Sequence, residues 1–147
     1  MRRVTLCRLV WVVPFALLMA SCDSQTTPTT PTTPTPTTVA VTDVFKGTVS
    51  QSGSAFHTFT TEAGTVTTTL KEIVPATLAG IGVDVGTWDG TTCTIVLTNT
   101  AATTGSALVG TASTSISLCV RVYDVGNISE EEPATYTVEV AHQTKPS

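Results

Sequence analysis

The residues best suited to covalent or metal chemistry are the cysteines and histidines, of which the chain has four and two. Cys93 and Cys119 form an even pair in the body of the chain. If the chain is exported, as its N-terminus indicates below, it enters an oxidising compartment where such pairs are oxidised. We therefore predict a Cys93–Cys119 disulfide, which closes a loop of about 27 residues and stabilises the fold by about 3.5 kcal/mol. Two cysteines with only His57 and His142 as added nitrogen donors make a zinc site a poor interpretation.

An acidic segment from Asp124 to Glu132 is the candidate metal site. Calcium takes six to eight oxygen ligands, and Asp124, Asn127 and Glu130 offer oxygens within one turn. The alternative is an Asx-type turn followed by a solvated run of charges. Both interpretations fit the sequence.

Catalytic residues are harder to find. Ser54 and His57 are three residues apart, so on one strand they point to opposite faces and cannot form a nucleophile and base pair. We expect His57 to be an exposed strand residue and the protein not to be an enzyme. A carboxylate pair for glycoside cleavage, drawn from Glu72, Asp84, Asp89 and Asp124, stays open.

Aromatic side chains offer a binding alternative. Trp88 precedes the turn signal Asp89-Gly90, and with Tyr123 it would form a stacking platform for a sugar or peptide. The competing interpretation is that Trp88 caps the hydrophobic core.

The first 21 residues are typical of a signal peptide. Arg2, Arg3 and Arg8 precede an apolar stretch over residues 9–20, which is shorter than the roughly 20 residues of a membrane-spanning helix. The stretch ends in Leu-Met-Ala-Ser-Cys, which resembles the lipobox of bacterial lipoproteins, so we expect a diacylglycerol on Cys22. The alternative is a soluble secreted protein cleaved after Ala20 or Ser21. The sequence is compatible with a lipid anchor in either the inner or the outer membrane.

The mature chain is acidic. From Cys22 onward it has four basic and eleven acidic residues, a net charge of −7. Nucleic-acid binding depends on Lys and Arg neutralising phosphates, so we exclude it.

A linker over residues 22–38 follows the signal peptide. Nine Thr and four Pro in residues 24–38, with no large apolar side chain, cannot build a core. At about 3.1 Å per residue in a polyproline-like form the segment spans roughly 45 Å. It is either such an extended spacer or a flexible tether of no fixed length.

Residues 39–147 have the pattern of a single all-β domain. Apolar and polar residues alternate with period two, which places one face in a core and the other in water. Turn residues separate the runs at about ten-residue spacing, so we predict an antiparallel β-sandwich of about eight strands. Residues 98–114 are rich in Thr, Ala and Gly, and most of this stretch could instead be loop. The predicted strands are 43–50, 55–61, 64–73, 81–88, 93–98, 105–110, 115–124 and 134–141.

Three groups of segments resemble the bacterial pre-peptidase C-terminal (PPC-like) domain. They are residues 45–49 (FKGTV), 57–66 (HTFT followed by GTV), and 119–124 with 136–138 (CVRVYD and YTV). The resemblance covers about residues 43–141 and implies a jelly-roll-like β-sandwich that serves as an accessory or binding module. Some relatives bind calcium, and many carry Asp two residues before the position of His57, where this chain has Ala55.

Together these features predict a lipid-anchored, non-catalytic cell-envelope protein whose β-sandwich is an accessory or ligand-binding module. Its expected partners are the membrane, through the lipid, and an envelope polysaccharide or protein. The alternatives are an inert structural surface protein on a spacer, or a small secreted hydrolase.

Overall fold

The computed structural model describes residues 37–146. The predicted signal peptide, Cys22 and all but the end of the linker therefore lie outside the described residues. Within residues 37–146 there is no helix of the length and hydrophobicity needed to cross a membrane.

Eight strands make up the described region, and each predicted strand has a counterpart. They are β1 (Val39–Val49), β2 (Ser54–Thr61), β3 (Gly64–Val74), β4 (Ile81–Trp88), β5 (Cys93–Ala102), β6 (Ala107–Ala112), β7 (Ile116–Tyr123) and β8 (Ala134–Thr144).

The segment that could have been mostly loop is largely strand. β5 continues to Ala102, and β6 begins at Ala107, two residues later than predicted. The delay comes from the turn at residues 103–106, where Gly105 has a φ of 91° and Ser106 donates its N–H to the carbonyl of Thr103. A positive φ favours glycine and interrupts the extended backbone that pairing needs.

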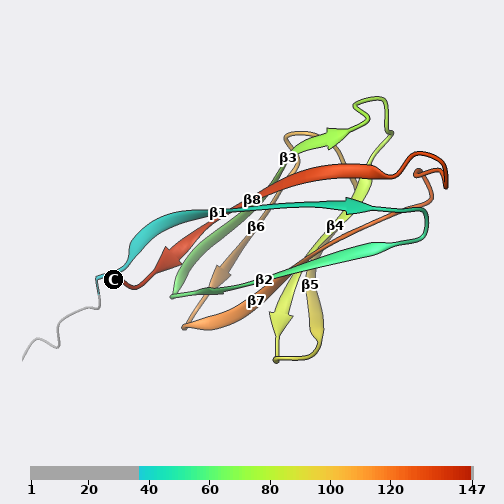
Figure 1. The fold of residues 1–147 in the computed structure, drawn as a ribbon. Coiled ribbons are helices and arrows are strands. Elements are labelled where there is room, and N and C mark those ends of the chain that lie inside the picture. The colour runs from blue at the N-terminus through green and yellow to red at the C-terminus, as the bar shows by residue number, and fades with distance from the viewer. Residues whose placement is uncertain (1–36, 147) are drawn as a thin grey trace, which may run out of the picture. The chain divides into compact units, whose positions relative to one another are not determined.

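The strands form two antiparallel sheets of four, so the predicted β-sandwich is confirmed. The first sheet has the order β1-β8-β3-β6 and the second β2-β7-β4-β5. Except for the β4–β5 hairpin, consecutive strands lie in different sheets, which is the jelly-roll arrangement (Figure 1). β1 and β8 pair along their whole length, with Val39 opposite Thr144.

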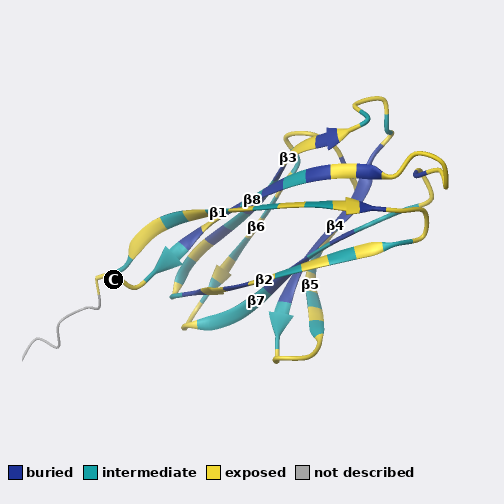
Figure 2. Ribbon diagram, viewed as in Figure 1, coloured by how far each residue is buried: buried dark blue, intermediate teal, exposed yellow. Residues whose placement is uncertain are grey.

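The core lies between the sheets, where the inward positions of the alternating strands meet. Figure 2 shows buried residues along the whole length of the strands, where they alternate with partly or fully exposed ones. Inward side chains such as Val66, Leu70, Val120 and Val138 are almost completely buried. Every paired strand and this whole core lie within residues 39–144, so the domain has what it needs to fold on its own.

β4 departs from the expected alternation. Its outward residues Gly82, Asp84 and Gly86 are buried, as are its inward valines. The strand is central in its sheet, and side chains and backbone from β7 and β5 cover its outward face. The prediction that one face of this strand is wet is therefore wrong.

The predicted disulfide between Cys93 and Cys119 is confirmed. It joins β5 to β7, which flank β4 on opposite sides. Two strands separated by a third are normally about 9.6 Å apart, yet the two Cα atoms here are 5.9 Å apart. The approach depends on Gly86, because a Cβ there would collide with the backbone of Thr94. A register shift between Val85 and Gly86 accompanies it.

One core position yields a stability prediction. Thr68 is 1% exposed, and within residues 37–146 its hydroxyl is the buried side-chain polar atom without a hydrogen-bond partner. A buried hydroxyl with no partner destabilises the native state. We expect Thr68→Val to raise the free energy of unfolding by about 1 kcal/mol, measured by urea unfolding of residues 39–147.

Thr61→Val is the matched control. The Thr61 hydroxyl is equally buried but donates to the carbonyl of Glu62 at 2.9 Å. The free energy of unfolding of Thr61→Val should be lower than that of the parent by about 1 kcal/mol. A Thr68→Val variant that is no more stable than the parent would contradict the assignment.

Candidate functional site

The outward face of the second sheet carries a row of functional side chains. Strand register places Phe56 of β2, Arg121 of β7, Asp84 of β4 and Thr98 of β5 side by side across the four strands. Such cross-strand neighbours are close enough to interact directly.

Asp84 and Arg121 form the ion pair of this row. Asp84 is fully buried, and its Oδ2 accepts hydrogen bonds from Arg121 Nε at 2.9 Å and from Nη2. The hydroxyl of Thr98 donates to Oδ1. Both carboxylate oxygens are therefore satisfied, as a buried charge requires. The arrangement fixes the guanidinium and leaves its Nη1 group free of Asp84.

Tyr123 supports Arg121 from the next outward position of β7. The guanidinium carbon of Arg121 lies 4.6 Å from the centre of the Tyr123 ring, within cation–π range. The ring packs on Gly82 of β4, where a Cβ would collide with it. Any side chain at position 82 would displace the ring and, with it, the support of Arg121.

Trp88 ends β4 at the hairpin to β5. The turn is held by Asp89, whose Oδ1 accepts N–H bonds from Thr91 at 2.8 Å and Thr92 at 2.7 Å. These bonds lower the pKa of Asp89, since they favour the charged carboxylate. The half-buried Trp88 lines a shallow depression together with Phe56, Arg121 and the hairpin residues Thr91, Thr92 and Cys93.

The predicted platform of Trp88 and Tyr123 is thus distributed around Arg121. Tyr123 contacts the guanidinium, and Trp88 lines the depression that Arg121 also lines, but the second aromatic wall of the depression is Phe56, which is 50% exposed. Sequence reasoning missed Phe56. Alternation puts Phe56 on the opposite face of β2 from Phe59, and only the burial of Phe59 in the structure shows that the face of Phe56 is the outward one.

The prediction for His57, the neighbour of Phe56 in β2, had the opposite fault. His57 shares the inward face of β2 with Phe59, so the prediction of an exposed strand residue is wrong. Its ring stacks on Phe45 at 4.8 Å between centres, and its Nε2 lies 2.7 Å from the Tyr136 hydroxyl. Burial lowers the pKa of His57 and raises that of Tyr136, so the neutral forms are favoured.

The proposed calcium loop is built around Asp124. Its Oδ1 accepts N–H bonds from Gly126, Asn127 and Ile128, and its Oδ2 accepts one from Ser52 at 2.8 Å. Burial alone would raise the pKa of Asp124, but these four donors outweigh it and lower the pKa. The geometry is that of the Asx-type turn.

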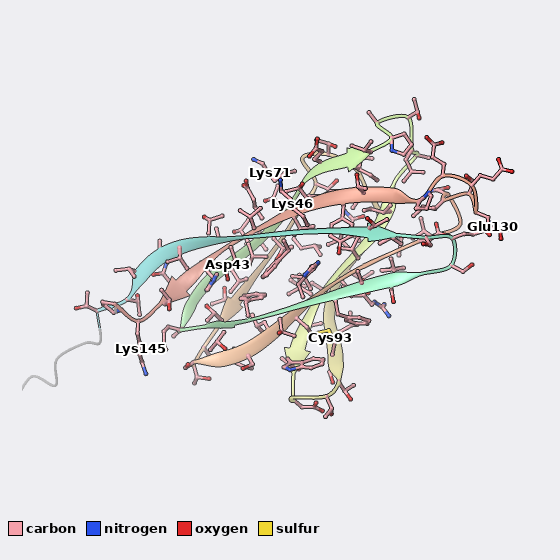
Figure 3. The ribbon with its side chains drawn as sticks, in the orientation of Figure 1. Asp43, Lys46, Lys71, Cys93, Glu130 and Lys145 are labelled. Atoms are coloured by element: carbon pink, nitrogen blue, oxygen red, sulfur yellow. A yellow bond between two sulfur atoms is a disulfide. The ribbon has the colours of Figure 1, made fainter. Side chains whose placement is uncertain are left out.

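The other two residues of the predicted calcium set have different surroundings. Asn127 donates its side-chain N–H to the carbonyl of Gly80. Glu130 is exposed in the loop beyond the strand ends (Figure 3). In the part of the chain that the structure describes, no three His, Cys, Asp or Glu residues form a group able to hold a metal ion.

The carboxylates considered for glycoside cleavage are also separated. Asp84 is bound by Arg121 on the second sheet, whereas Glu72 is exposed on the first, where it accepts a hydrogen bond from Thr137. Asp89 and Asp124 each cap a turn. The structure therefore uses each of these three aspartates in a local structural role.

The Asp124 turn makes acid stability testable. Because the folded pKa lies below the unfolded value of 3.8, the turn stabilises the fold above that pH and loses this contribution as the pH falls through the folded pKa. We expect the melting temperature to drop as the pH falls below about 4. Asp124→Asn should lower it at pH 7 and make the acid drop smaller.

Glu131→Gln controls for the loss of one charge in the same loop, since Glu131 is exposed there. It should leave the melting temperature at pH 7 unchanged. An acid drop of the same size in Asp124→Asn and in the parent would contradict the assignment.

No protein-family model matches the chain, and no curated protein matches it. The PPC-like resemblance therefore rests on the segments quoted above.

Proposed function

We propose that this protein is a lipid-anchored, non-catalytic component of the cell envelope, and that its β-sandwich binds an uncharged carbohydrate on the outward face of the second sheet. The observation that carries the proposal is the depression between Trp88 and Phe56, which has the fixed guanidinium of Arg121 in its lining.

The chemistry of the depression matches a sugar. Aromatic rings stack on the C–H faces of sugar rings, and an exposed phenylalanine beside a half-buried tryptophan offers two such surfaces. The free Nη1 of Arg121 and the hydroxyl of Thr92 provide polar partners for sugar hydroxyls.

Charge favours an uncharged ligand. The positive charge of Arg121 is balanced by Asp84 directly beneath it. The mature chain carries a net charge of −7, which repels anionic polymers. A neutral polysaccharide experiences neither attraction nor repulsion and is selected by shape and hydrogen bonds.

Support for the envelope location comes from the N-terminal sequence. The apolar segment, the lipobox-like residues before Cys22 and the Thr/Pro-rich spacer are the parts of a tethered lipoprotein. The PPC-like resemblance points to the same kind of secreted accessory module.

Acylation is tested on the full chain expressed in a bacterial host. The parent protein should fractionate with membranes, and the intact mass should include acyl chains on Cys22. Cys22→Ser should be released in soluble form. A parent protein without an acyl adduct would contradict the anchor.

Binding is tested with residues 39–147 on an array of neutral and acidic glycans. We expect binding to a neutral glycan, weakened about thirtyfold by Trp88→Ala and by a comparable factor by Phe56→Ala, as for a central aromatic contact of about 2 kcal/mol. Val44→Ala is the matched control, because Val44 is 52% exposed on β1 of the other sheet.

The outcomes separate the alternatives. If Trp88→Ala and the parent bind the glycan equally well, the binding site is not the depression beside Trp88. If the parent binds no glycan on the array, the inert structural protein is favoured. If the parent cleaves a glycan, the hydrolase is favoured.

A further inference from the structure

A second cavity opens between the two sheets, on the side away from the aromatic core residues. Its volume is about 360 Å³. β5 and β6 share the turn at residues 103–106, are the edge strands of different sheets, and diverge from that turn (Figure 1). The cavity occupies the resulting gap, and its apolar wall is formed by Val66, Val85, Leu97, Leu108, Ile116 and Leu118.

We infer that this cavity binds one linear hydrocarbon chain of an amphiphile with an uncharged head group. The site is distinct from the carbohydrate face proposed above, because it lies inside the sandwich rather than on the outside of the second sheet.

The cavity follows from how the core residues are distributed. The aromatic core side chains Phe45, Phe59 and Tyr136 fill the space near β1, β2 and β8, together with the ring of His57. The wall of the cavity in the other half of the core has no aromatic side chain, and it includes Gly110 of β6. At that glycine, Gly110, a Cβ would already come within 3.2 Å of Leu97, so a larger residue there would reach into the cavity.

The lining determines the class of ligand. The wall contains no charged residue, so an ion would lose its hydration without a partner. Thr111, Ser113 and Thr114 line the cavity and are exposed to solvent, which places hydroxyl groups at its mouth. An apolar chain inside with a neutral polar head at these hydroxyls satisfies both regions.

Volume determines the length of chain. A methylene group is about as large as a water molecule, whose share of the liquid is about 30 Å³. A cavity of about 360 Å³ therefore holds roughly twelve carbon atoms. The gap between packed sheets, about 10 Å from backbone to backbone, suits one extended chain rather than a ring system.

The experiment is a titration of isotopically labelled residues 39–147 with octanol, decanol, dodecanol and tetradecanol below their solubility limits, followed by methyl NMR. Each methylene that enters the cavity should tighten binding about fourfold. The gain should stop near dodecanol, when the cavity is full. Shift changes and intermolecular NOEs should map to methyl groups of Val66, Leu108 and Leu118.

Two variants on one strand sharpen the test. Ala112→Leu fills the cavity from its inward, half-buried position on β6 and should abolish dodecanol binding, whereas Val109→Leu adds volume at a 60% exposed position and should not. If Ala112→Leu fails to fold, the intermolecular NOEs between dodecanol and the parent domain still show whether the alcohol lies in the cavity.

Three results would overturn the inference. They are the absence of saturable binding, an affinity that keeps rising through tetradecanol as in simple partitioning, and NOEs that map to Phe56 and Trp88 instead. The last result would place the alcohols on the outer face and leave the cavity without a ligand.

Discussion

The ion pair between Asp84 and Arg121 is the constraint on which the outer face of the second sheet depends. A fully buried carboxylate is tolerated only when its charge is balanced and its oxygens accept hydrogen bonds. Arg121 and Thr98 meet this requirement from the two strands that flank β4. Together with Thr98 the pair joins three strands, and it holds the guanidinium in place. Tyr123, Trp88 and Phe56 are all arranged around that fixed group.

Much of the fold was predictable because its signals are local. Alternation of Val, Ile and Thr marks a pleated strand, and Asp89-Gly90 or Gly126-Asn127 marks the turn that ends one. All eight strands were found on this basis. Cys93 and Cys119 were paired because they are the two cysteines that remain when Cys7 of the predicted signal peptide and Cys22 of the predicted lipid anchor are set aside, which needs no knowledge of the fold.

The arrangement of the candidate site was not predictable in the same way. Period two divides β2 into two faces but does not say which face is inside, so His57 was placed outside and Phe56 was overlooked. Asp84 presented a similar difficulty. Its partner Arg121 is 37 residues away, and only the register of β4 against β7 brings them together. Burial of the outward face of β4 likewise depends on side chains from neighbouring strands.

The full-length pairing of β1 with β8 has a consequence for protein engineering. Since Val39 lies opposite Thr144, the two ends of the domain are only one interstrand spacing apart. The domain can therefore be inserted into a surface loop of a host protein without separating the host's flanking residues. The same closeness permits circular permutation, with the old ends joined by a short peptide and new ends opened in the turn at residues 103–106.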